Sequence, residues 1–139
     1  MVLGTAAVAV VLVAGTTAYG MQAPDDLAGV AGWYAVGLLC FITIGLAVGA
    51  MAPTGRSANA IGNLLFVPMF LLGGGGPPRD VMGDAMRTVS DVLPLTHVVG
   101  GLRQSWLGQT DDPHALWWPL LVSVVCAGVA LAVARRRTT

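Results

Sequence analysis

Charged residues are scarce in this sequence. They make up 10% of its 139 residues, whereas a soluble domain carries about 25%. Lysine is absent and the formal net charge is zero, so the chain lacks the electrostatic footprint of a nucleic-acid-binding protein, and we expect no nucleic-acid partner. Hydrophobic residues make up 55% of the chain, and its mean hydropathy is +0.76. This composition predicts an integral membrane protein.

Patterns that support catalysis or metal binding are also missing. Cys40 and Cys126 lie in apolar stretches without metal or redox spacing, and we interpret them as small buried hydrophobic residues. His97 and His114 have no cysteine or carboxylate at ligand spacing. The glycines at 73–76 are not followed by the Gly-Lys-Ser/Thr of a phosphate-binding loop. We therefore predict no catalytic, metal-binding or cofactor-binding residues, and no enzyme.

What the chain does contain is a series of long apolar segments. They cover about residues 2–19, 30–52, 58–76 and 115–134. A helix needs roughly 20 residues to cross the hydrocarbon core of a bilayer. The third segment is marginal by this measure, and the other three are long enough. The pattern predicts an all-α, polytopic membrane helix bundle that forms a single domain over 1–139, with about four membrane segments.

The apolar segments share one further absence, which is that none contains an acidic, basic or histidine side chain. Proton-coupled transporters and ion pathways need such groups within the membrane. The energy for any transport should therefore come from elsewhere. A signal peptide is an alternative interpretation of the first segment, but the segment lacks a basic n-region and its apolar core is too long.

The arginines predict the orientation of the chain. Arg56 lies between the second and third segments, and Arg135, Arg136 and Arg137 follow the fourth. The positive-inside rule places these residues, and with them both termini, in the cytoplasm. The connection after the third segment is then extracytoplasmic. Three further arginines lie in that connection, and their position outside the cytoplasm conflicts with the positive-inside rule. Helices at the membrane interface that carry these arginines would reduce the conflict.

That connection has the pattern of two amphipathic helices, at about 78–93 and 95–108. Pro78 suits a helix start and Pro94 separates the two helices. In the first helix the polar face includes Ser90 and Asp91. The glycines before it permit a tight reversal. We favour a helix pair that re-enters the membrane or lies at its interface, and the alternative is an ordinary extracytoplasmic loop with one surface helix.

The second segment contains Gly45 and Gly49, a GxxxG spacing that lets helix backbones approach closely. We assign these two glycines to helix packing. Small residues are so abundant in this chain that chance explains the spacing equally well.

The run from Gly45 to Gly108 resembles the C-terminal half of ABC-2 type permeases, the membrane subunits of ABC exporters of drugs, lipids and polysaccharides. The resemblance covers about residues 30–135 and rests on the order and spacing of its features. The features begin with a small-residue helix at Gly45–Ala52, a short cytoplasmic turn at Arg56–Asn59 and a helix at Leu64–Gly76 that ends near a glycine. They continue with two separated prolines, Pro78 and Pro94, a Leu-Arg pair at Leu102–Arg103 and a last membrane helix at Ala115–Ala134.

The resemblance implies a permease subunit in the plasma (inner) membrane of a bacterium, forming a path for a hydrophobic or amphipathic substrate, as in efflux and drug resistance. Its expected partners are a separate ABC ATP-binding subunit, a second permease in a homo- or heterodimer, and membrane lipid. The helix pair would form an outer gate. We assign its apolar packing to Val81, Met86, Val89, Leu95, Val99 and Leu102, and its hinge to Gly73, Gly74, Gly75 and Gly76.

Family members typically have six membrane helices, so the resemblance also implies that the chain is incomplete at its N-terminus. Two alternatives remain from the residues alone. One is a small self-sufficient exporter with four helices, and the other is a membrane accessory or scaffold protein that transports nothing.

Overall fold

The structure, a computed structural model, describes residues 2–18, 22, 24–76, 81–109 and 113–138. All regular elements among these residues are helical, which confirms the predicted all-α bundle. In chain order they are α1 (Val2–Ala18), α2 (Leu27–Met51), α3 (Gly55–Phe70), a π-helical turn η1 (Leu71–Gly75), α4 (Asp84–Val92), α5 (Pro94–Trp106), a short 3₁₀ turn η3 (Pro113–Leu116) and α6 (Trp117–Thr138).

Three helices among the described residues are long and apolar enough to cross a membrane. They are α2, the continuous Gly55–Gly74 helix formed by α3 with η1, and Trp117–Arg136 of α6. The third segment was expected to be marginal, but its helix begins at Gly55 and continues through the π-helical turn for 20 residues, which is about 30 Å. The first segment forms α1, whose 17 residues are not among the three, and its predicted end at residue 19 lies outside the described residues.

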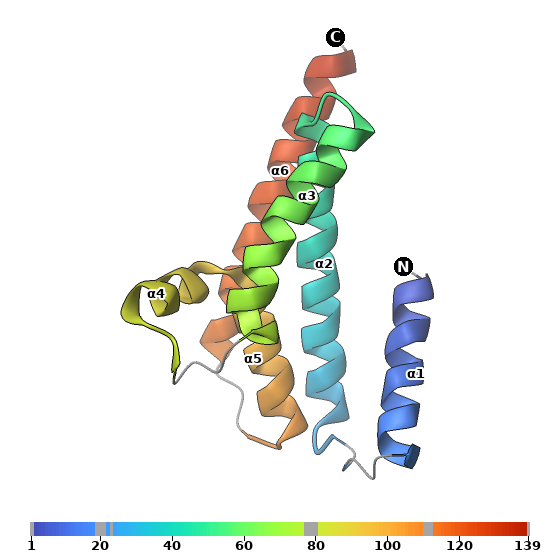
Figure 1. Ribbon diagram of the computed structural model, residues 1–139. Helices are drawn as coiled ribbons and strands as arrows, with labels where there is room; N and C mark the ends of the chain where they lie inside the picture. The colour runs from blue at the N-terminus through green and yellow to red at the C-terminus, as the bar shows by residue number, and fades with distance from the viewer. Residues whose placement is uncertain (1, 19–21, 23, 77–80, 110–112, 139) are drawn as a thin grey trace.

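The core lies on one face of α2, where α6 and α5 pack against it (Figure 1). Residues three or four positions apart along α2 are buried there, as expected for one helical face. They are Trp33, Gly37, Cys40, Thr43 and Ala47. Cys40 is fully buried, as predicted, whereas Cys126 is half-buried. The buried Thr43 hydroxyl donates to Leu39 O and Cys40 O of its own helix, so it needs no partner across the core.

Helix α5 runs antiparallel to the N-terminal half of α2, and glycines set the distance between them. A Cβ added to Gly37 would lie 2.8 Å from Val98 Cγ1, and Gly101 lies directly against the indole of Trp33. At the end of the pair the backbone N–H groups of Asp25 and Asp26 donate to carbonyls near the end of α5. Since side chains at these glycines would collide with the facing helix, the two helices approach closely at Gly37 and Gly101.

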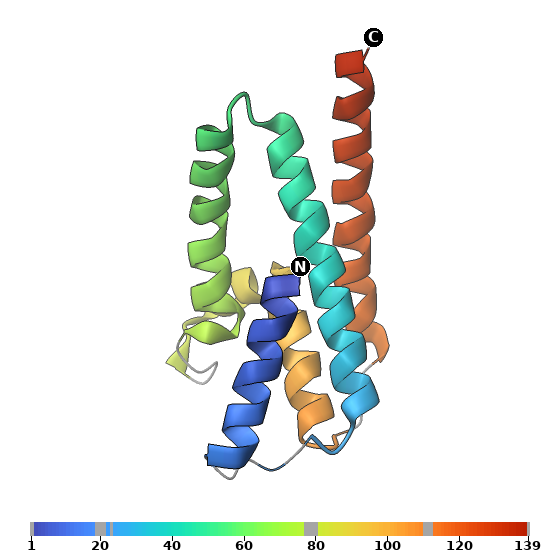
Figure 2. The same cartoon turned by 90° about the vertical axis from the view of Figure 1, so that its right-hand side faces the viewer.

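The turn between α2 and α3 lies at the same end of the bundle as the C-terminal end of α6 (Figure 1). Thr54 caps α3 in a capping box with Ser57, which stabilises this turn. Arg56 therefore lies at the same end as Arg135 and Arg136. We call this the arginine end. Away from it α2 and α3 separate, and α1 stands beside the bundle (Figure 2).

We predict that Gly101→Ala destabilises the fold, because its Cβ has to displace the buried indole of Trp33. Overpacking of this kind costs about 1–3 kcal/mol. The measurement is the free energy of unfolding of the purified protein in detergent, followed by circular dichroism. Gly100→Ala is the matched control, since a Cβ there meets nothing within 4 Å. Equal stability of the two variants would contradict the close packing of α5 on α2.

Candidate functional site

The helix formed by α3 ends in a tight glycine turn. The π-helical η1 contains Gly74, whose φ of +125° is a conformation that residues with side chains rarely adopt. Two of the four predicted hinge glycines are packed against α5: a Cβ on Gly73 would lie 2.9 Å from Leu95 Cβ, and one on Gly74 would lie 2.7 Å from Val99 Cγ1. The structure thus brings the predicted hinge into contact with two of the predicted gate residues.

Near the end of η1 the carbonyl of Leu72 accepts a hydrogen bond from another helix. In a π-helix the C=O of one residue accepts from the N–H five residues later. The residue five positions after Leu72 in the sequence is Pro77, and proline has no N–H. The hydroxyl of Ser90 in α4 donates to Leu72 O at 2.8 Å. The hydroxyl of Thr96 lies 3.2 Å from that of Ser90.

Ser90 was assigned to the outward polar face of its helix, and this assignment is wrong. The side chain is fully buried, with no exposed surface. A prediction from helical periodicity assumes that a hydroxyl side chain faces water. Here the cost of an unpaired buried carbonyl, about 1–3 kcal/mol, makes the inward position favourable.

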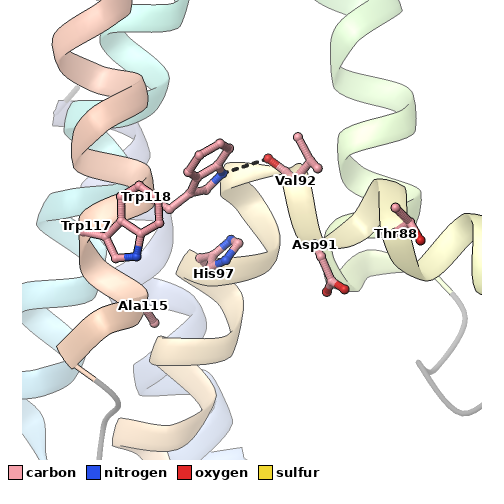
Figure 3. A pocket seen from close by; sticks show the side chains of 7 residues that line it. All are labelled: Thr88, Asp91, Val92, His97, Ala115, Trp117 and Trp118. Carbon is pink, nitrogen blue, oxygen red and sulfur yellow. Dashed lines mark hydrogen bonds between the residues drawn. The ribbon is translucent and has the colours of Figure 1, made fainter.

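A second carbonyl lacks a donor where Pro94 ends α4. The residue before it, Leu93, is extended at φ −75° and ψ 128°, as residues before proline prefer. The N–H of Thr96 donates to Leu93 O at 3.2 Å and not to Val92, four residues before it. The carbonyl of Val92 accepts instead from the indole Nε1 of Trp118 in α6, at 2.8 Å (Figure 3).

We call residues 90–97, the junction of α4 and α5, the elbow. Its two long-range hydrogen bonds join residues 18 and 26 positions apart in the sequence. Ser90 ties the elbow to the end of α3, and Trp118 ties it to the start of α6. His97 Nδ1 lies 3.2 Å from Leu93 O, and because a carbonyl only accepts, this nitrogen carries the proton. The elbow is therefore held on two sides by side-chain donors.

Helix α4 lies across the long axis of the bundle (Figure 1). It begins at Asp84, so Val81 lies before it and not within it, and Pro78 lies outside the described residues. Val81, Met86 and Val89 are exposed, so their predicted packing role needs a surface outside this chain. On α5, by contrast, the predicted gate residues Leu95, Val99 and Leu102 are half-buried.

A pocket of about 590 Å³ opens beside the elbow. His97 and the tryptophans lie on one side of it and Thr88 and Asp91 on the other, with Val92 and Ala115 completing the lining (Figure 3). The rings of Trp117 and Trp118 meet edge to face with centroids 5.3 Å apart. Among the described residues no group of three His, Cys, Asp or Glu side chains could hold a metal ion.

A second, apolar groove of about 650 Å³ lies between α2 and α3. Gly45 and Gly49 line it, together with phenylalanines from both helices, and a Cβ at either glycine would meet nothing within 4 Å. Within this chain the GxxxG pair therefore borders a groove instead of packing against a helix. Close approaches to a bulky apolar side chain of another helix fall at Gly37, Gly73, Gly74 and Gly101, of which only the hinge glycines were singled out from sequence. The bulky residue that faces each of these glycines is distant in the sequence, so the spacing of neighbouring residues does not predict the contact.

Comparison with known proteins gives one match. The family model described as ABC-2 type transporter matches residues 1–107, which include α1 to α5 and the elbow, while α6 lies beyond the match. No curated protein and no solved structure matches the chain.

We predict that Gly74→Ala lowers the free energy of unfolding by about 2–4 kcal/mol. A side chain at positive φ costs about 1–2 kcal/mol, and the collision with Val99 adds an overpacking cost. The change is measured by denaturant titration of the detergent-solubilised protein with tryptophan fluorescence. Gly62→Ala in α3 is the control, because a Cβ there meets nothing within 4 Å. Wild-type stability of Gly74→Ala would show that the glycine turn is not required.

Proposed function

Because the chain belongs to the ABC-2 type transporter family, we propose that it forms part of the translocation path of an exporter for a hydrophobic or amphipathic substrate. The family match over residues 1–107 is the observation that carries this proposal. Three helices among the described residues are long and apolar enough to cross a membrane, which supports a multi-pass membrane protein. The family's membrane domain is a permease and not itself an enzyme.

The membrane helices indicate where the energy comes from. Along the apolar stretches at 27–52, 57–76 and 115–134 the sequence has no acidic, basic or histidine side chain, so a proton or ion gradient has no group to act on there. ABC-2 permeases work with an ATP-binding subunit. Binding and hydrolysis of ATP by such a partner would drive the movement of this chain.

The arginine end supports one orientation. Arg56 lies at the same end of the bundle as Arg135 and Arg136, and cytoplasmic ends of membrane helices are enriched in basic residues. In this orientation the end of α6 is cytoplasmic, in the plasma membrane of a bacterium, and with α1 as a fourth crossing segment the N-terminal end is cytoplasmic as well. The α5 end, with Asp25, Asp26 and Gln109, then faces the outside.

The elbow, with η1, α4 and α5, would form the outer gate of the path. Leu95 and Val99 pack on Gly73 and Gly74, which would act as the hinge. The exposed apolar side chains of α4 would contact lipid or a second permease in a dimer. The apolar groove between α2 and α3 is compatible with an alkyl chain or another hydrophobic part of a substrate.

The proposed orientation predicts which cysteines a membrane-impermeant maleimide can reach. In a Cys40→Ala/Cys126→Ala background, Gln109→Cys should be labelled in intact spheroplasts and Gly55→Cys only in inside-out vesicles. Both positions are exposed in the structure, and Gly55 is the first residue of α3, at the arginine end. Labelling of Gly55→Cys in intact spheroplasts would reverse the orientation and move the elbow to the cytoplasmic side.

The proposed function predicts that this chain stimulates its cognate ATP-binding subunit. Vesicles that hold both proteins should hydrolyse ATP several-fold faster than vesicles with the subunit alone. A subunit with its phosphate-binding lysine replaced is the control for contaminating activity. Failure of the two proteins to associate or to affect hydrolysis would count against an exporter role.

A further inference from the structure

The two carbonyls lie where the elbow meets the ends of two helices that are long enough to cross a membrane. Leu72 is two residues from the end of Gly55–Gly74, and Trp118 is the second residue of Trp117–Arg136. The side chain of Ser90 is fully buried and its bond to Leu72 O is part-buried, whereas the bond from Trp118 to Val92 O is exposed. A buried carbonyl that loses its donor costs about 1–3 kcal/mol, so the Ser90 bond is the costlier one to break.

We propose that Ser90 and Trp118 are positioning residues of the outer gate, which hold it closed by donating hydrogen bonds to Leu72 O and Val92 O. This inference rests on the proposed role of the elbow as the gate. Movement of the elbow away from α3 breaks the Ser90 bond, and movement away from α6 breaks the Trp118 bond. Each leaves a carbonyl without the side-chain donor that it has in the structure: Leu72 O loses Ser90, and Val92 O loses Trp118, while the N–H of Thr96 donates to Leu93 O.

The direction of the bonds shows how the contact at Ser90 joins three elements. The carbonyl of Leu72 only accepts, so the single hydroxyl proton of Ser90 is used there. In the contact between the two hydroxyls, Thr96 must then be the donor. A chain of hydrogen bonds runs from α5 through α4 to η1, and the fully buried Ser90 is its central member.

Accessibility of the elbow provides a direct test. Leu95→Cys is the reporter, since Leu95 is half-buried against Gly73. Cys126 is replaced by alanine, and Cys40, which is fully buried, stays as an internal indicator of intact folding. The protein is placed in nanodiscs with and without its ATP-binding subunit, and the rate of reaction with a polar maleimide is measured at each cysteine by mass spectrometry.

Loss of either donor should raise the labelling rate of the reporter by about two- to tenfold, the effect of one lost hydrogen bond. Ser90→Ala removes the first donor, and Trp118→Phe removes the second while keeping an aromatic ring. Cys40 should remain unlabelled in both variants. With the partner present, nucleotide should increase labelling in the wild-type background and have a smaller effect in Ser90→Ala, whose gate is already partly open.

Two matched variants should leave the labelling rate unchanged. Thr88→Ala removes a hydroxyl of the same helix that bonds only within α4, to Asp84 O. Trp117→Phe replaces the neighbouring indole, which does not donate to Val92 O. Wild-type labelling in both Ser90→Ala and Trp118→Phe, or equal labelling of Ser90→Ala and Thr88→Ala, would overturn the inference.

The labelling and hydrolysis measurements separate this inference from the proposed function. If the subunit's ATP hydrolysis is stimulated but the labelling rates do not change in the variants, the positioning role fails alone. If labelling rises in the variants but the wild-type chain neither binds nor stimulates the subunit, the exporter role fails and the gate assigned to these bonds fails with it.

Discussion

A buried carbonyl needs a hydrogen-bond donor, and the junction of α4 and α5 depends on that requirement. Helix α4 ends at Val92, and the N–H of Thr96, four residues later, donates to Leu93 O. The indole of Trp118 donates to Val92 O instead, and the buried hydroxyl of Ser90 donates to Leu72 O. As a result, α4 is joined to both η1 and α6.

Glycine contacts place α5 between α2 and η1. On the α2 side, Val98 packs on Gly37 and Trp33 packs on Gly101. On the η1 side, Leu95 packs on Gly73 and Val99 packs on Gly74. Packing of this kind suits a membrane protein, because lipid provides no hydrophobic drive for helix association and close contact takes its place. The same contacts explain how a glycine-rich turn can hold one defined conformation. Its backbone forms the surface on which α5 packs.

Much of the apolar surface remains uncovered within the chain. Met69 is the buried residue of α3, and the groove beside Gly45 and Gly49 is open. The apolar side chains of α4 are exposed as well. In the proposed function this surface would contact lipid, a second permease or a substrate. Such a surface fits the family assignment, in which the membrane domain works as part of a larger assembly.

The sequence by itself determined the class of the protein, the positions of α2, α3 and α6, the break at the glycines and the end of α4 before Pro94. These features depend on composition, on helical periodicity and on proline, which act locally along the chain. The tertiary structure alone decided that Ser90 turns inward, that α4 begins at Asp84 and that α5 packs on Gly37 and not on the GxxxG pair. The reason is that a periodic pattern reports how polar a side chain is. It does not show which distant carbonyl lacks a donor, and only the fold brings Trp118 to Val92 and Ser90 to Leu72.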